Sequence, residues 1–373
     1  MVKCRPRFFS KQLLKHNLPF VLLVLLVLSR VSGFCEGDIK ACAERPLEFN
    51  NLLIIQKIDP FLERIRNKAI QRARKYFPSP ASELLLGMTI GVDHFKKLPQ
   101  FKEMLLKTGT IHVVVVSGYN ISLVYSLMAA LLGSFYNRTK LLIGFSVALF
   151  YALLSGFDPP VIRSWIMGSI AYLGKYYGRS FPTLRVLIVS GLLMILWQPL
   201  FSFSLSFQLS FCATLSLILF SDTISKLSIT SKIPEFFRED FTATVAAQIL
   251  VWPLISIYFG RVSIISILVN TLVLWTVPVS TVFGGAFLLL FFVGDFLSRI
   301  LAFFVYIPLG IFANAIELFS KVSFAQVEFQ FSLVGFAVYY LVVLFMKVRT
   351  SLFASLDVGE IMEKEGPIVA DVS

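Results

Sequence analysis

The side chains best suited to chemistry in this sequence are polar residues that interrupt long apolar runs. A polar group is costly in lipid unless it meets a partner or a water-filled cavity, so each marks a helix contact or a hydrated path. Packing between helices explains any single one of them as well as pore lining does. Their spread over several segments favours a shared hydrated interior. These residues are His112, Ser117, Asn120, Arg163, Gln208, Gln248 and Asn270.

Arg163 combines a permanent charge with a membrane-like setting. It follows residues 158–160, Asp-Pro-Pro, which form a good helix start with Asp as the cap and Pro in the first turn. Arg163 should therefore stand about one turn into an apolar helix. There it either extends outward, pairs with Asp158, or presents its planar guanidinium to a passing phosphate.

Two further patterns concern helix contacts. Ser204, Gln208 and Phe211 are spaced i, i+4 and i+7, which places a polar and aromatic stripe on one helix face. The pair Ser117-Gly118 permits close approach of a second helix, and Asn120 beside it offers both hydrogen-bond donors and acceptors.

The motifs of common enzymes do not occur in this sequence. The segment Gly168 to Tyr176 contains Gly-Lys but has the wrong spacing for a nucleotide-binding loop. The four cysteines and three histidines show no zinc-site spacing, and no nucleophile-elbow serine is present. We therefore expect a protein that is not an enzyme, without catalytic residues, metal or cofactor.

The composition requires a membrane. Of the residues, 57% are hydrophobic and 15% are charged, and the mean hydropathy is +0.79. A water-soluble domain carries about 45–50% apolar and about 25% charged residues, so the excess apolar surface must face lipid. With the apolar run near the N-terminus, roughly ten transmembrane helices of about 20 residues are expected. The other candidates are 111–134, 139–157, 161–178, 184–199, 202–221, 241–259, 262–293, 297–320 and 331–347.

We thus predict an all-α, polytopic integral membrane protein with re-entrant or broken segments. Residues 82–92 are too short to span and should be re-entrant or interfacial. The stretch 262–293 is too long for one simple span and should be a kinked helix or two half-helices. The expected domains are a basic N-terminus with a membrane anchor (1–34), an external linker with an amphipathic helix (35–80), the polytopic domain (81–347) and a polar tail (348–373).

The clearest amphipathic helix is predicted at 61–77, ended by Pro78 and Pro80. Such a helix should lie in the plane of the membrane interface. Its apolar side is formed by Leu62, Ile65, Ala69, Ala73 and Tyr76, and its basic side by Arg64, Lys68, Arg72 and Lys75.

The distribution of charge sets the orientation. The chain carries a formal net charge of +12, and most basic loops fall inside when the N-terminus is inside. The basic helix at 61–77 falls outside on this map, so the topology does not explain its charge. It binds either anionic lipid headgroups or a polyanion.

Five motifs occur in an order that resembles the ComEC-type competence channel, over about residues 62–345. They are LLLGMTIG, TGTIHVVVVSGYNISLV, GFDPPVIRSWIMGSIAYLGKYYGR, FSLSFQLSFCATLSL and AAQILVWPLISIYFGRVSIISILVNTLVLWTVP. Within them His112 with Ser117-Gly118, Arg163, residues 207–211 and Asn270 with Pro278 match the pattern of that family. At Asn120 many members have His instead.

The resemblance implies a channel that conducts single-stranded DNA across the cytoplasmic (inner) membrane of a bacterium during natural transformation. It also implies separate partners: a DNA receptor, a nuclease and a cytosolic motor, besides membrane lipid and a possible second copy of the chain. Family members often carry an external oligonucleotide-binding-type domain and a C-terminal metallo-β-lactamase-like domain. Residues 35–60 are too few for the first, and residues 355–359 resemble only the opening strand of the second. We therefore expect no metal-dependent nuclease in this chain.

Two other readings of the same scaffold stay open. One is a transporter or exporter of another solute, since a fold does not determine its substrate. The other is a non-conducting structural subunit, in which the polar residues serve packing alone.

Overall fold

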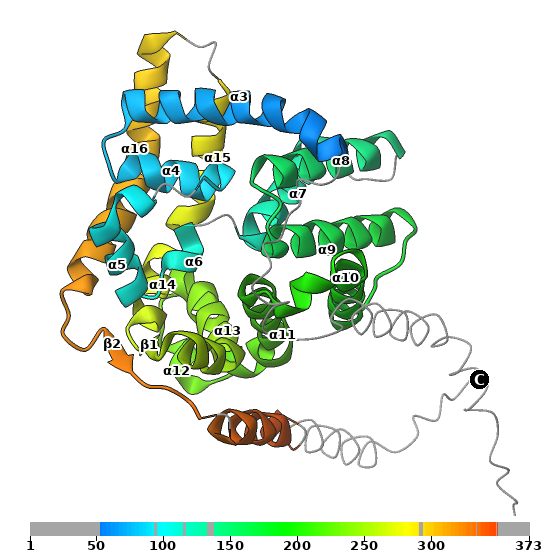
Figure 1. Ribbon diagram of the computed structural model, residues 1–373, viewed down its shortest axis with the longest axis vertical. Coiled ribbons are helices and arrows are strands. Elements are labelled where there is room, and N and C mark those ends of the chain that lie inside the picture. Colours follow the sequence, from blue (N-terminus) through cyan, green and yellow to red (C-terminus); the bar gives the residue numbers. More distant parts are fainter. Residues whose placement is uncertain are drawn as a thin grey trace, which may run out of the picture.

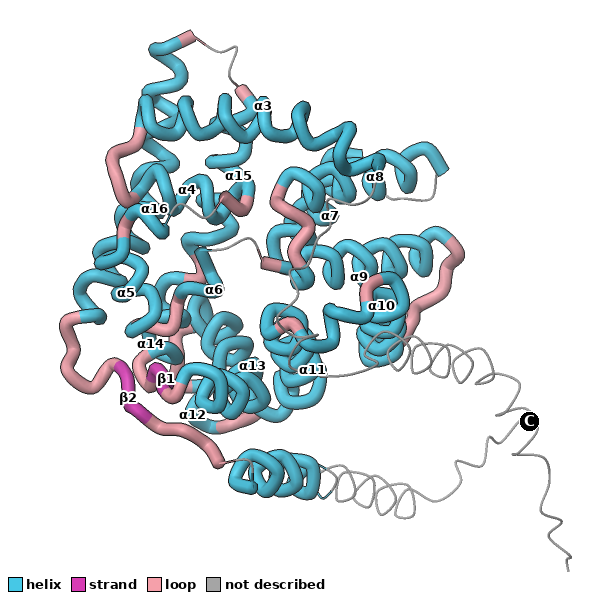
Figure 2. The backbone as a smooth tube through the Cα atoms, viewed as in Figure 1, coloured by secondary structure: helices cyan, strands magenta, loops and turns pink. Residues whose placement is uncertain are grey.

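The computed structural model describes residues 53–92, 95–114, 117–132, 138–290, 294–332, 334–347 and 349. Within these ranges nearly every element is a helix, which confirms the all-α class (Figure 2). The described strands are β1 (Arg261–Ser263) and β2 (Gln326–Glu328), paired antiparallel with Val262 opposite Val327. The membrane anchor predicted within 1–34 lies outside the described residues, as does the tail apart from Arg349.

The helices follow one another with short connections (Figure 1). In chain order they are α3 (Leu53–Tyr76), α4 (Ala81–Ile90), η2 (Phe95–Lys97), α5 (Pro99–Lys107), α6 (Ile111–Val114), α7 (Gly118–Leu132), α8 (Arg138–Leu154), α9 (Pro159–Tyr176), α10 (Thr183–Trp197), η3 (Pro199–Phe203), α11 (Leu205–Ser225), α12 (Ser228–Ser231), α13 (Glu235–Phe259), α14 (Ser266–Val273), α15 (Thr276–Leu289) and α16 (Asp295–Ser320). A further apolar helix covers Val334–Lys347.

Two clusters of buried apolar side chains organise these helices. The first joins α3 to α6 with α14, α15 and α16, and the second joins α7 to α11. In Figure 1 the two groups lie on opposite sides, and α3 crosses over both. Helix α13 packs along α11 and α14, so it connects the two groups a second time.

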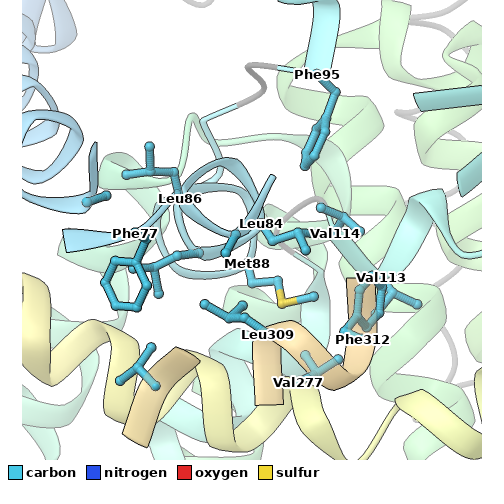
Figure 3. Close-up of a cluster of buried hydrophobic side chains, with 14 of the residues drawn as sticks. Phe77, Leu84, Leu86, Met88, Phe95, Val113, Val114, Val277, Leu309 and Phe312 are labelled. Carbon is cyan, nitrogen blue, oxygen red and sulfur yellow. The ribbon is translucent and has the colours of Figure 1, made fainter. Parts of the chain in front are cut away.

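Helix α4 covers most of residues 82–92, for which we expected a re-entrant or interfacial segment. All ten of its residues are buried inside the protein. Met88 points toward Leu309 of α16, whereas Leu86 points to the opposite side of α4, as Figure 3 shows; both belong to the first cluster. Burial in protein is the condition under which a short re-entrant segment is tolerated at membrane depth, so re-entry stays a prediction.

Four helices are long and apolar enough to span a membrane within the described part of the chain. They are 111–131, counted across α6 and α7, and Leu205–Ser225, Glu235–Phe259 and Asp295–Ser320. Helices α14 and α15 pass the same test together but are bent by 45° at the break between them, which raises the number to five. The roughly ten spans expected from sequence are not reached, because helices such as Thr183–Trp197 and Val334–Lys347 are shorter than that test requires.

The prediction for 262–293 allowed a kinked helix or two half-helices. The structure has β1, α14 and α15 in this stretch. Pro278 lies in the first turn of α15, where a missing N–H costs no helix bond. The break therefore precedes Pro278, between Val273 and Thr276.

The surface of the long helices is apolar where a soluble protein would be polar. On α16, Phe296, Phe303 and Phe304 are 81%, 64% and 61% exposed. Large exposed apolar surface of this kind is characteristic of contact with lipid. The fold thus agrees with a membrane protein.

Pro253 sits inside α13 and removes the N–H that would bind the Ile249 carbonyl. The hydroxyl of Tyr339, on the helix Val334–Lys347, donates to that carbonyl at 2.9 Å, and Tyr340 donates to the Leu250 carbonyl at 2.6 Å. The late helix is therefore docked where α13 offers an unpaired backbone acceptor.

Candidate functional site

Arg163 lies in the first turns of α9, as the sequence predicts. Asp158 occupies the N-cap with an extended backbone, and Pro159 is the first helical residue. The Asp158 side chain forms no capping hydrogen bond; instead its carbonyl accepts from the Val161 and Ile162 amides. The helix start is confirmed, with the backbone and the proline fixing it.

The guanidinium of Arg163 is held by uncharged groups. Its Nε donates to Ser210 Oγ at 2.8 Å, and its Nη1 lies 3.5 Å from Met167 Sδ. Its carbon Cζ stands 5.9 Å from the centre of the Phe211 ring. Among the described residues no carboxylate forms an ion pair with it, so pairing with Asp158 is not what the structure shows.

Gly118 explains how α7 reaches this arginine. A Cβ on Gly118 would stand 2.0 Å from Ser164 Oγ and 2.9 Å from Arg163 Nη2. Only glycine lets the start of α7 meet α9 so closely, as the Ser117-Gly118 pair suggested. Ser117 is half-buried beside it, and His112 on α6 is exposed.

The predicted polar and aromatic stripe on α11 makes contacts within the protein. Gln208 Nε2 donates to the Ser202 carbonyl at 3.0 Å, and its Oε1 accepts from Tyr258 Oη at 3.0 Å. Phe207 and Phe211 are stacked with their ring centres 4.2 Å apart. Gln208 thus ties η3, α11 and α13 together, while the ring stack positions Phe211 next to Arg163.

Asn120 faces the core and not a surface. Its side chain is 2% exposed, and Nδ2 donates to the Met88 carbonyl of α4 at 2.9 Å. This contact joins the second group of helices to the first. Asn120 thus makes a packing contact between helices, and path lining stays a prediction.

Gln248 and Asn270 lie at the contact between α13 and α14. Gln248 Nε2 donates to Ser266 Oγ at 2.9 Å, and Asn270, one turn after Ser266, is 1% exposed. Both lie at one helix contact, and neither is among the residues that contact Arg163. The seven polar candidates thus fall into separate groups rather than one continuous set of mutual contacts.

Helix α3 carries the predicted apolar and basic sides. Leu62, Ala69 and Ala73 are buried in the first cluster, so the predicted apolar side is confirmed but is covered by protein. Arg64 and Lys68 are exposed.

Arg72 and Lys75, also on the predicted basic side, make contacts that tie α3 to α15 and α16. Arg72 donates from Nε to the Phe287 carbonyl at 2.9 Å and from Nη2 to the Leu290 carbonyl and Ser298 Oγ, both at 3.0 Å. Lys75 Nζ lies 2.8 Å from Asp295 Oδ1, and this hydrogen bond raises the pKa of Lys75. Arg72 is thus a structural contact, which corrects its place in an open, DNA-attracting face.

Arg66 was not singled out by the sequence. It donates from Nε to the Leu154 carbonyl at 2.9 Å and from Nη2 to the Leu153 carbonyl at 3.0 Å. Both carbonyls end α8, where the helix dipole is negative and the last carbonyls lack helical donors. The sequence signal was only that Arg66, four residues after Leu62, falls at the edge of the apolar side of the helix.

An all-α chain with exposed phenylalanine on long apolar helices and a charged arginine held among them is an integral membrane protein. More particularly, the chain belongs to the competence protein family, which matches residues 89–352.

Three relatives are similar over part of the chain. An uncharacterised protein of Aquifex aeolicus is 40% identical over 126 residues, or 33% of this chain and 30% of that protein. ComE operon protein 3 of Bacillus subtilis is 24% identical over 211 residues, or 56% and 26%. The uncharacterised protein YcaI of Escherichia coli is 28% identical over 150 residues, or 38% and 20%. The chain thus spans less than a third of the length of each relative, and no solved structure matches it.

Proposed function

We propose that this chain forms a channel that conducts single-stranded DNA across the cytoplasmic membrane of a bacterium during natural transformation. Membership of the competence family supports a role in DNA uptake. The name of the Bacillus subtilis relative, ComE operon protein 3, agrees with the family.

The observation that carries the proposal is that the charged guanidinium of Arg163 is surrounded by uncharged groups. Its contacts in the described chain are a hydroxyl, a thioether and an aromatic ring, all uncharged. A guanidinium held within an apolar bundle is costly, and that cost is offset when the charge meets an anion in function. Phosphate is one of the two anions, with carboxylate, whose geometry matches this planar, five-donor cation.

The exposed cations of α3 support the first step of the same process. Arg64 and Lys68 are exposed, and positive charge gathers phosphates without reading base sequence. In this proposal they collect DNA, Arg163 contacts the strand in transit, and separate proteins serve as receptor, nuclease and motor.

The test is uptake of labelled DNA into a DNase-protected state in the source organism. We expect deletion of the gene to abolish uptake and the intact gene to restore it. Arg163→Ala should lower uptake by about tenfold or more, the effect of losing one charge-assisted contact. Arg179→Ala, which removes an exposed arginine just after α9, is the matched control and should restore uptake fully.

Immunoblots of the membrane fraction must show equal amounts of each variant. Normal uptake by the deletion strain, in cells shown to be competent, would contradict the DNA-channel proposal. Transport of another solute would then be the favoured function. Normal uptake with Arg163→Ala would remove Arg163 from the path.

A further inference from the structure

The contact between α13 and α14 holds three buried oxygen atoms that have no hydrogen-bond partner among the described residues. They are Thr244 Oγ1, Gln248 Oε1 and Asn270 Oδ1. Asn270 is 1% exposed and Thr244 is 6% exposed. Buried acceptors in proteins are almost always satisfied, so three unpartnered ones on one helix pair require an explanation.

Two contacts fix how the helices lie against each other. Gln248 Nε2 donates to Ser266 Oγ at 2.9 Å near the start of α14. Just beyond the other end of α14, the rings of Phe236 and Trp275 are 5.8 Å apart. The residue numbers fall along α13 as they rise along α14, so the two helices run antiparallel.

This register brings Thr244 and Asn270 to the same level. Thr244 is one turn from Gln248 in the direction of Phe236, and Asn270 is one turn from Ser266 in the direction of Trp275. Both therefore lie between the two fixed contacts. The three unpartnered oxygen atoms thus belong to one stretch of a single interhelical seam.

The chemistry of these atoms selects a class of ligand. A hydroxyl and two amide carbonyl oxygens are hard, neutral donors, which suit alkali and alkaline-earth cations and not the softer transition metals. Ca²⁺ and Mg²⁺ sites are usually built with carboxylates, and none is among the three. Glu239 and Asp240 precede Thr244 on α13, with Asp240 one turn away, so negative charge stands near one end of the seam.

We propose that this seam binds one alkali metal cation, Na⁺ or K⁺, through Thr244 Oγ1, Gln248 Oε1 and Asn270 Oδ1. The site is separate from the contacts of Arg163, and its existence does not depend on DNA conduction. Bound there, the cation links α13 to α14 at the level of the buried side chains Thr244 and Asn270.

The experiment uses the full chain purified in detergent, with radiolabelled sodium and, in a second arm, radiolabelled rubidium as a substitute for potassium. Choline chloride keeps the ionic strength constant. We expect saturable binding in one arm, which identifies the cation. Thr244→Val and Asn270→Leu, close in shape to the native residues, should each weaken binding by about tenfold or more.

The matched control is Asn120→Leu. Asn120 is another buried amide whose Oδ1 has no partner among the described residues, but it lies on α7 and contacts α4. This variant should bind the cation as the native chain does. If Asn270→Leu does not fold, as judged by thermal unfolding, Thr244→Val decides, since it removes only one hydroxyl. Absence of saturable binding by the folded native chain overturns the proposal, as does native affinity in Thr244→Val.

Discussion

Arg66 and Arg72 lie on the same helix, α3, and each binds the carbonyl groups at the end of a different helix. Arg66 holds Leu153 and Leu154 of α8, whereas Arg72 holds Phe287 of α15 and Leu290 just after it. Since α8 belongs to the second group of helices and α15 to the first, α3 joins the two groups with its own side chains.

Arg72→Met should therefore destabilise the protein. It keeps the apolar stem but leaves the Phe287 and Leu290 carbonyls without their donor, and a hydrogen bond to a charged group contributes about 1.5–3 kcal/mol. We expect a loss of about that size by thermal or denaturant unfolding in detergent. Arg64→Met, on the exposed part of the same helix, should change stability by less than about 0.5 kcal/mol. Equal losses in both variants would contradict the capping role.

Gly118→Ala tests the close approach of α7 to α9. The added methyl group meets Ser164 Oγ and Arg163 Nη2 at distances that require movement. Overpacking of this kind costs about 1–3 kcal/mol, so the unfolding temperature should fall. Gly285→Ala is the control, since nothing lies within 4 Å of its added Cβ. In a helix interior it should raise stability by up to about 1 kcal/mol. A lowered unfolding temperature in both variants would point to general intolerance of alanine.

Tyr339 and Pro253 should be coupled through the Ile249 carbonyl. Tyr339→Phe removes the hydroxyl that donates to this acceptor and should cost about 1 kcal/mol. In a Pro253→Ala background the backbone N–H returns and satisfies the carbonyl, so the same change should cost less. A double-mutant cycle of unfolding free energies measures the difference. Additive costs would show that the two residues act independently.

Neutralising the exposed cations of α3 should weaken DNA association. Binding of a labelled single-stranded oligonucleotide is followed by fluorescence anisotropy over a series of salt concentrations. The double change Arg64→Gln and Lys68→Gln should flatten the plot of log affinity against log salt by about 0.7 per lost phosphate contact. Lys75→Gln, which removes a cation bound to Asp295, should have a smaller effect. An unchanged slope in the double variant would leave α3 without a role in binding DNA.

The sequence predicted those helix starts, ends and breaks that depend on neighbouring residues alone. The Asp-Pro-Pro start of α9, the end of α3 before Pro78 and the break within 262–293 are set by backbone geometry and by proline, so they could be predicted. The number of spans could not, because apolar composition does not distinguish a helix in lipid from one buried in protein. Helix α4 is the clearest case.

Sequence alone thus determined the helical class, the membrane character and the apolar side of α3, because hydropathy and helical period are properties of the chain itself. The tertiary structure decided what each polar residue meets. Arg64 and Arg72 share one predicted face, yet only Arg72 reaches helix-end carbonyls, since α15 lies beside it. Asn120 and Gln208 both looked like path residues, yet each binds a backbone carbonyl of a neighbouring segment. A helical period gives the direction of a side chain, and only the packing of distant segments supplies its partner.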